Sequence, residues 1–506
     1  MNKFFNKNLK IYFLTVSAFL IASLLWDKIQ FKYTNPDEII GYYSIFKYSP
    51  LNDNVRFIFF VSFVLLTYLI SFIHFNELKI NNFKNSFLLE RKKNNQENRS
   101  LIFLYVLIII QLLVFFSSEL NINPIDLFHE GQALSGALNF KLLDKLWSGS
   151  YIVTSLFVDI LNSNIAWGLL DIQSLSSYRF FVEILNLICS ILILIFLFKF
   201  TNVLSLNKNL KNIFFIILSY FVFILLDNNT FSYRDIPLFI FLIIIYEIIC
   251  KNKNLKLNSF LLGILPVISL LWSLDRGIFV IAGYIPLIFV LFINHKTKEL
   301  LIIFFFFIIS LASFYFLVGK TEFTFFLSNS YDILRSSDLL NGIIHPSPFS
   351  GEQGSSRATK NLLIITLNGI ILINYFFLKK KNLNKNLIIF LFLYYFVSLV
   401  FYKIGVTRSD GGHLKQGVSL NLILLIYLLA YNFLFFIDKK TSLSNSKPGL
   451  IKLATFILIF LIFFSNTQKN FINNILNFKS RVSNYINSND LFYLNISEKN
   501  LINELK

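Results

Sequence analysis

Repeated long apolar runs constrain this chain more than any other feature of its sequence. A hydrocarbon core about 30 Å thick needs roughly 20 apolar residues of helix, and the 506-residue sequence contains many runs of about that length. Only 15% of the residues are charged and 62 are Phe, whereas a soluble domain is about a quarter charged. A membrane β-barrel would instead show alternating segments of about 10 residues. The sequence therefore predicts an all-α polytopic membrane protein.

The apolar runs predict about thirteen transmembrane helices. We expect these spans near residues 11–26, 57–74, 101–117, 178–198, 212–226, 235–250, 258–273, 277–293, 300–318, 361–378, 386–401, 418–437 and 451–466. Residues 1–100 then form two N-terminal spans with a basic loop. Residues 101–466 form a transmembrane catalytic module, and residues 467–506 form a polar outward tail. Three Lys residues precede the first apolar run as in a signal peptide, but no small-x-small motif lies before Trp26, which predicts a retained span.

The distribution of basic residues predicts the sidedness of the loops. Seven short segments hold 25 of the 46 Lys and Arg residues in about 85 positions; they are 1–10, 75–100, 199–211, 251–257, 294–300, 379–385 and 438–452. Because basic loops face the cytoplasm, we predict a cytoplasmic N-terminus and place the intervening loops outside. The expected location is a bacterial inner (cytoplasmic) membrane, with the active face in the periplasm.

The formal net charge of +18 does not indicate a nucleic-acid partner. Lys residues sit in short clusters between apolar runs, as in Lys379-Lys380-Lys381-Asn382, a pattern typical of membrane-flanking loops. Cys189 and Cys250 are the only cysteines and lie in or beside apolar runs. The sequence therefore predicts neither a disulfide framework nor a thiolate metal site, and the lipid bilayer is the expected partner.

The most distinctive polar motif on the predicted outer side is Asp126-Leu-Phe-His129-Glu130-Gly131, within the large loop 118–177. Asn123-Pro124 predicts a helix start just before it, with Asp126 in the first turn, where the helix dipole favours a negative charge. Asp126 and Glu130 are four residues apart and share one helical face. Helical spacing of apolar residues downstream predicts a helix along the membrane surface, with a second one near 151–162. The alternative is that Asp126 is only a helix-start charge and His129 only an interfacial residue.

Three other predicted outer loops carry basic groups that suit a phosphate. Arg binds phosphate bidentately and stays ionised, whereas Lys acts as a compact point charge. Two glycines between Arg408 and His413 allow the backbone to approach a ligand closely. The alternative is lipid-headgroup anchoring and local ion pairing, such as Arg276 with Asp275. The candidate phosphate-binding residues are Arg234, Arg276, Arg408, Asp410, His413 and Lys415.

Acids and a His facing cations at one membrane surface suggest sugar transfer from a lipid phosphate. A carboxylate acts as general base toward an acceptor hydroxyl, and cations stabilise a departing phosphate. Direct displacement at the anomeric carbon inverts its configuration and needs no covalent intermediate. The sequence assigns no cofactor. Whether Asp126, Glu130 and His129 bind a divalent cation such as Mg²⁺ or Mn²⁺ stays open, because their spacing alone does not show it.

These motifs resemble those of GT-C superfamily membrane glycosyltransferases. The chain is similar to uncharacterised bacterial members with an early His-Glu-Gly motif and a late Arg-Ser-Asp-x-x-His motif, here His129-Glu130-Gly131 and Arg408-Ser409-Asp410-Gly-Gly-His413. The resemblance implies many spans, interfacial helices in a first large outward loop, and a polyprenyl-phosphate-linked sugar donor. It also implies that Asp126 is the first choice for the base and Glu130 the second, with His129 assisting. In this chain three expected spans precede the acidic loop, two more than usual, since the loop usually follows the first span.

Two other functional classes fit parts of the sequence. An O-antigen ligase or polymerase also uses outward Arg and His residues on lipid-linked glycans, but its usual signature is a large late outward loop, and 319–360 is only moderately long. A lipid or solute transporter or flippase needs ionisable residues inside its spans and alternating access. Charges in the middle of spans are scarce, although Pro266 and Pro286 suggest broken helices. We therefore predict a glycosyltransferase that acts on a cell-envelope glycan, lipid or protein acceptor.

Overall fold

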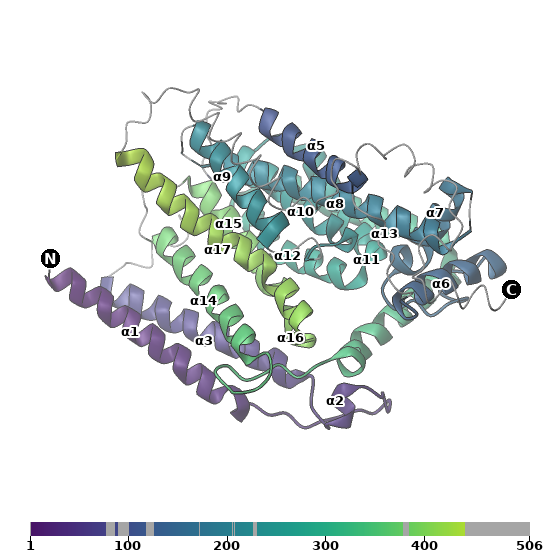
Figure 1. Cartoon of the computed structure of the whole chain (residues 1–506), viewed down its shortest axis with the longest axis horizontal. Helices are drawn as coiled ribbons and strands as arrows, with labels where there is room; N and C mark the ends of the chain where they lie inside the picture. The colour runs from purple at the N-terminus through teal and green to yellow at the C-terminus, as the bar shows by residue number, and fades with distance from the viewer. Residues whose placement is uncertain are drawn as a thin grey trace.

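A computed structural model describes residues 2–76, 87–89, 101–117, 126–171, 173–204, 206, 208–225, 230–377 and 384–440 (Figure 1). Within these ranges the chain is helical and forms no strands; a single isolated bridge pairs Ile343 with Arg408. The prediction of an all-α fold is therefore confirmed. Loop 118–125, the thirteenth expected span and the C-terminal tail lie outside the described residues.

Nine helices of the described chain are long and apolar enough to cross a membrane, which fits a multi-pass membrane protein. Many of their large apolar side chains are exposed on the outside of the bundle, as a lipid-facing surface requires, and others pack against one another inside it. These helices are α1 (Asn2–Leu25), α3 (Leu51–Asn76), α8 (Leu175–Asn202), α11 (Leu255–Trp272), α12 (Leu274–Ile293), α13 (Thr297–Asn341), α14 (Ser355–Phe377), α15 (Lys385–Phe401) and α17 (Gly411–Lys440).

Three of the other expected spans form shorter or interrupted helices. Residues 101–117 become α5 (Ile102–Ser117). Residues 212–226 become α9 (Lys208–Tyr220), which continues as a π-helix, η4 (Phe221–Leu225). Residues 235–250 become α10 (Ile236–Tyr246), followed by the π-helix η6 (Glu247–Lys251). Thirteen spans therefore remain a prediction, while nine are supported by length and composition.

Figure 1 shows α1 and α3 side by side at one edge of the bundle, next to α14 and α17. The centre is packed by aromatic rings from helices far apart in sequence. Phe200 of α8 stacks on Tyr427 of α17, with ring centroids 3.8 Å apart. Gly263 of α11 lets α13 come close, because a Cβ there would meet the Ile303 carbonyl oxygen at 2.8 Å. Small residues at such crossings are typical of packed membrane helices.

The described loops gather at two opposite ends of this bundle. At one end, which we call the α6 end, α1 stops and α3, α8, α12, α14 and α17 begin; there the Trp26 ring packs against His345, with centroids 5.0 Å apart. At the other end, the Lys199 end, Lys199 pairs with Glu247. Every predicted site residue lies at the α6 end, as expected for loops that share one side.

Two short helices lie at the α6 end, where the sequence predicted interfacial helices, but their limits differ from the predictions. The first, α6, spans His129–Leu143, so Asp126 precedes the helix instead of occupying its first turn. The second consists of the π-helix η3 (Phe157–Leu161) and α7 (Asn162–Leu170), so the prediction of 151–162 was wrong in extent. Residues 151–155 are not helical, and the backbone N–H groups of Thr154 and Ser155 donate to the Asp159 carboxylate instead.

The helix predicted over 300–318 also continues beyond its expected end. Gly319 has φ +81°, and α13 bends there and then runs on to Asn341. Left-handed backbone of this kind favours Gly. Trp147 packs against Phe314 and Phe326 on both sides of the bend, with centroids 5.9 and 5.2 Å away. Much of the region expected as a loop, 319–360, is therefore helix.

Candidate active site at the α6 end

Asp126 caps the start of α6 with its side chain. Its Oδ1 accepts hydrogen bonds from the backbone N–H groups of Phe128 and His129, at 3.1 and 3.0 Å. Its Oδ2 lies 2.7 Å from His129 Nδ1. The hydrogen bonds from His129 lower the pKa of the Asp126 carboxyl below its usual value. Half of the Asp126 side chain is exposed (50%), so an ionised carboxylate is open to a ligand.

Glu130 is held differently, although it lies one turn away. Arg179 of α8 donates from Nε and Nη2 to the two Glu130 carboxylate oxygens, at 2.6 and 2.8 Å. Only 15% of the Glu130 side chain and 10% of the Arg179 side chain are exposed. Two-pronged pairing of this kind fixes orientation as well as charge. Glu130 therefore anchors α6 to α8 and has little freedom to take a proton from a substrate.

We expect Glu130→Gln to lower the free energy of unfolding by about 2 kcal/mol, since it removes a charge-assisted, mostly buried pair. Arg179→Gln should cost a similar amount. The double variant should cost less than the sum of the two, because neither charge is then left without its partner. Thermal unfolding of all three purified variants measures this coupling. Additive losses would contradict the anchoring role.

A buried carboxylate, Asp159, lies beneath α6. Its Oδ2 accepts hydrogen bonds from the backbone of Thr154 and Ser155, at 2.7 and 3.3 Å. Burial raises the pKa of Asp159. α6 closes on it through Gly136, where a Cβ would meet the Asp159 carbonyl oxygen at 2.4 Å. The sequence analysis did not include Asp159 in the site, because a single acid in an apolar run carries no pattern of its own.

Arg234 and Arg276 lie in one group of alternating charges, which we call the Arg–Asp quartet. Arg276 Nε lies 2.7 Å from Asp235, and its Nη1 lies 2.9 Å from Asp275. Arg234 Nη2 is 2.9 Å from the same Asp275. Arg276 and Asp235 are almost fully buried, whereas 31% of the Arg234 side chain and 42% of the Asp275 side chain are exposed. Only the Arg234–Asp275 half is therefore open to a ligand.

The quartet is built on two helix starts. Arg234 and Asp235 belong to a short 3₁₀ turn, η5 (Tyr233–Asp235), which leads into α10. Ser273 alone separates α11 from α12 and places Asp275 and Arg276 in the first turn of α12. The sequence predicted a turn of about three residues there. The shorter break explains why Arg276 points into the bundle.

Backbone contacts join the quartet to the α6 region. Ser155 Oγ donates to the Trp272 carbonyl at 2.6 Å, and Leu274 N donates to the Thr154 carbonyl at 3.0 Å. Trp272 also stacks on Phe157 of η3, with centroids 3.7 Å apart. These contacts join the segment beneath α6 to the helix break that carries Asp275 and Arg276.

Arg408, Asp410 and His413 form a third group, at the start of α17. Asp410 accepts from Arg408 Nε at 2.9 Å and lies 2.8 Å from His413 Nδ1. Although partial burial opposes it, hydrogen bonding from His413 and the charge of Arg408 lower the pKa of Asp410. Lys415 lies half-buried two residues further along α17. Asp410 is thus a helix cap and an ion-pair partner in one.

This third group is separate from the first two. Arg357 of α14 donates to the Gly411 carbonyl beside it, at 2.6 Å. Between the described residues, no hydrogen bond or ion pair connects Arg408, Asp410 or His413 with the acidic motif or the quartet. The quartet does contact the end of α15, since the Arg276 guanidinium lies 5.3 Å from the centroid of the Phe401 ring. The predicted residues thus share one end of the bundle but not one contact network.

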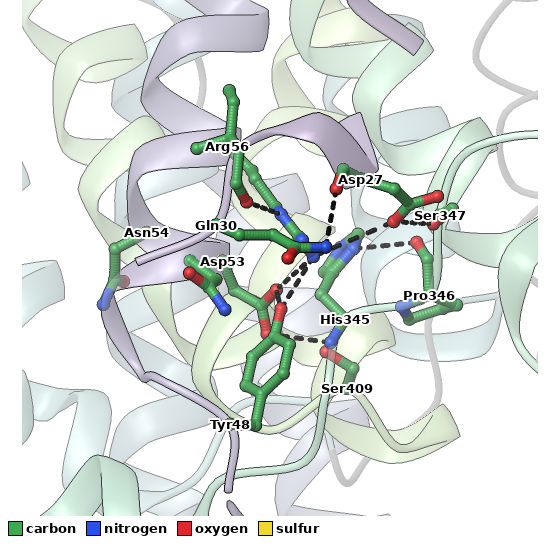
Figure 2. Close-up of polar contacts among 12 residues, drawn as sticks. Asp27, Gln30, Tyr48, Asp53, Asn54, Arg56, His345, Pro346, Ser347 and Ser409 are labelled. Atoms are coloured by element: carbon green, nitrogen blue, oxygen red, sulfur yellow. Dashed lines mark hydrogen bonds and ion pairs between the residues drawn. The ribbon is translucent and has the colours of Figure 1, made fainter. Parts of the chain in front are cut away.

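Figure 2 shows a buried polar centre at the same end that the sequence analysis missed. Asp53, at the start of α3, is 1% exposed. It accepts hydrogen bonds from Tyr43 Oη at 3.0 Å, from Tyr48 Oη, and from the backbone N–H of His345 at 2.9 Å. Arg56 Nη1 lies 3.6 Å away. The only sequence signal was an Asp and an Arg three residues apart at a span start.

The Asp53 centre fastens the two N-terminal helices to the rest of the protein. Arg56 Nε donates to the Ile29 carbonyl at 3.0 Å, and Ser347 Oγ donates to Asp27 at 2.6 Å. Tyr43 belongs to the short helix α2 (Tyr42–Ile45), and His345 Nε2 lies 3.2 Å from the Tyr402 hydroxyl, next to α16 (Lys403–Thr407). Segments some 300 residues apart meet here, which explains how α1 and α3 are attached.

His345 predicts a pH dependence of stability. Burial lowers the pKa of His345 from 6.5 to about 4, so the folded state favours the neutral form of its imidazole. The resulting stability is complete above pH 6.5 and is lost as pH falls from 6.5 to about 4, by about 3 kcal/mol in all. The unfolding temperature of the protein, measured relative to that of His345→Gln, should fall over this range. The exposed His295 at the Lys199 end offers a control, since His295→Gln should leave this fall unchanged.

No group of three or more His, Cys, Asp or Glu side chains is placed to hold a metal ion within the described ranges. Divalent-cation binding by Asp126, Glu130 and His129 therefore remains open, as it was from the sequence. Comparisons of this chain with protein-family models, curated proteins and solved structures found no match. The resemblance to GT-C glycosyltransferases consequently rests on the short motifs alone.

Proposed function

We propose that this protein is a membrane glycosyltransferase that moves a sugar from a polyprenyl phosphate to a cell-envelope glycan, lipid or protein. The observation that carries the proposal is the exposed Asp126 carboxylate at the start of α6. Hydrogen bonds from His129 favour its ionised form, and the half-exposed Arg234–Asp275 pair lies at the same end of the bundle. A base and a cation at headgroup depth suit a lipid-phosphate donor.

In the proposed reaction, Asp126 accepts the proton of an acceptor hydroxyl. That oxygen attacks the anomeric carbon, the bond from this carbon to the phosphate oxygen breaks, and polyprenyl phosphate leaves with both bonding electrons. His129 holds the carboxylate through its Nδ1 contact. Displacement from the face opposite the phosphate inverts the sugar. Glu130, bound by Arg179, positions α6 and does not exchange protons in this scheme.

The departing phosphate requires cations, and the structure offers two sets. Arg234 is partly exposed but shares its charge with Asp275. Arg408 is 43% exposed and pairs with Asp410, beside His413 and Lys415. A dianionic phosphate would replace the carboxylate at one of these guanidinium groups, since charge-assisted bonds to phosphate are strong. Arg276 is buried with Asp235, so its proposed role is to hold Asp275 in place.

Transport is less well supported than transfer. α11 and α12 run continuously through Pro266 and Pro286, whereas transporter sites use helices that break near the bilayer centre. An O-antigen ligase-like or polymerase-like enzyme remains the second candidate, since the long helix after Gly319 adds a substantial late segment at the α6 end. Both enzymatic readings place the active face in the periplasm of an inner membrane, with a cytoplasmic N-terminus.

A donor panel tests the proposal. Purified protein in lipid nanodiscs would receive polyprenyl-phosphate-linked hexoses and pentoses together with a membrane extract as acceptor. We expect release of polyprenyl phosphate from at least one donor, and product sugars of inverted configuration by NMR. Turnover only with polyprenyl-pyrophosphate-linked glycans would favour the ligase. A lack of release from all donors, with substrate moved across the bilayer instead, would contradict both.

A further inference from the structure

A cavity of about 380 Å³ opens at the Lys199 end, between α1, α3, α14 and α17. Its volume lies in the range of small-ligand sites. Figure 1 shows these four helices together at one edge of the bundle, and the cavity lies at the opposite end from Asp126. The ten lining residues include no charged side chain; they are Asn8, Ile11, Tyr12, Tyr68, Phe72, Asn76, Ile371, Asn374, Tyr375 and Asn432.

Three amide residues lie at the mouth of the cavity. Asn8, Asn76 and Asn374 lie near the ends of their helices at the Lys199 end. Ile11 and Phe72 lie about one turn deeper and are 2% and 4% exposed, so they close the inner end, where the polar Tyr68 also lies. An amide-lined mouth beside membrane-spanning helices fits the head of a lipid better than it fits a soluble sugar.

Several lining groups have unused hydrogen-bonding capacity. The Asn8 amide and the Tyr12 hydroxyl form no hydrogen bond with any other described residue. Asn374 Oδ1 accepts from Tyr68 at 2.5 Å, which leaves the Asn374 NH₂ group free to donate. Asn432 donates to the Tyr375 hydroxyl and to the Leu428 carbonyl, which leaves its own Oδ1 free to accept. The three Asn residues are half-buried, and such groups normally find partners, whereas Tyr12 is 53% exposed.

We propose that this cavity binds a membrane lipid whose headgroup carries neighbouring hydroxyl groups, as a glycosyl headgroup does. Neutral amides both donate and accept, as a hydroxyl-rich group requires, and the hydroxyl of Tyr12 adds a third kind of contact. A phosphate would instead call for Arg or Lys in the lining. The acyl chains would stay outside the cavity, in the bilayer, because Ile11 at its inner end is 2% exposed. This inference is independent of the proposed transferase activity.

Native mass spectrometry of the delipidated protein tests the site. The probes are glucosyl-diacylglycerol, phosphatidylglycerol and phosphatidylethanolamine with identical acyl chains. We expect glucosyl-diacylglycerol to bind about tenfold more tightly than phosphatidylethanolamine. Asn8→Leu should remove most of this preference. Asn374→Leu, which also breaks the bond with Tyr68, provides a second variant. Asn202→Leu, at the same end but outside the cavity, is the matched control and should keep the preference.

Each outcome decides the question. A preference shared by glucosyl-diacylglycerol and phosphatidylglycerol supports recognition of hydroxyls and shows that glycerol is enough. A preference for glucosyl-diacylglycerol alone supports a sugar site. Equal binding of all three lipids, or equal loss in Asn8→Leu and Asn202→Leu, overturns the proposal. Sugar transfer measured on the same samples keeps this result distinct from a failure of the proposed activity.

Discussion

Replacing Asp126 by Asn is expected to reduce sugar transfer by 10²- to 10⁴-fold, the usual contribution of a general base. Asn keeps the side-chain oxygen that caps the backbone of Phe128 and His129 but cannot hold the proton of the acceptor. Protein level and unfolding temperature should therefore change little, since Asn is as good a cap as Asp. The measurement is release of polyprenyl phosphate by equal amounts of purified protein.

The same helix supplies a matched control for Asp126→Asn. Asp144 follows the last residue of α6, is exposed, and has φ +52°, a conformation that Asn tolerates well. Asp144→Asn should retain full transfer. If Asp126→Asn transfers sugar as fast as Asp144→Asn, Asp126 is not the base. Loss in Asp126→Asn but not in Glu130→Gln would support the order Asp126 before Glu130.

Replacing Asp53 by Asn is expected to lower the free energy of unfolding by about 3–5 kcal/mol, the cost of breaking a buried ion pair by removing one charge. Arg56, 5% exposed in its side chain, would keep its charge in a buried place. The hydroxyls of Tyr43 and Tyr48 would also lose an ionised acceptor. Burial and the charge of Asp53 raise the pKa of both phenols, so both remain donors. The unfolding temperature of the detergent-solubilised protein measures the loss.

Two variants separate this cause from general damage. Asp27 also faces Arg56, at 3.9 Å, but 65% of its side chain is exposed, so Asp27→Asn should cost within about 1 kcal/mol. Adding Arg56→Met to Asp53→Asn should restore part of the stability, because no buried charge is then unpaired. A double variant less stable than Asp53→Asn would show that the unpaired charge of Arg56 does not cause the loss of stability in Asp53→Asn.

Local sequence pattern predicted the helices but not their irregular parts. Length and hydropathy were enough for nine of the expected spans, because each long apolar run must satisfy its backbone within itself. The start of α6 was misplaced because Asp126 satisfies the first N–H groups from outside the helix. The continuation of α13 beyond Gly319 was missed because residues 320–341 are too polar to extend an apolar run.

The candidate site divides in the same way. Asp126, His129 and Glu130 could be read as a group because they are neighbours in the chain. The pairing of Glu130 with Arg179 spans 49 residues, and that of Arg234 with Asp275 spans 41. No periodicity encodes such pairs. These ion pairs determine which charged side chains remain exposed. The exposed ones are the predicted residues that can contact a ligand.

The sequence by itself determined that this chain is helical, suited to a membrane and polar in its loops. These properties depend on the transfer of side chains and backbone groups between water and lipid, which each segment undergoes almost independently. Only the tertiary structure decided that Arg276 is buried while Arg234 is open, and that Asp53 joins α3 to His345. Ion pairing in a packed interior depends on distance in space, and hydrophobic periodicity does not contain that distance.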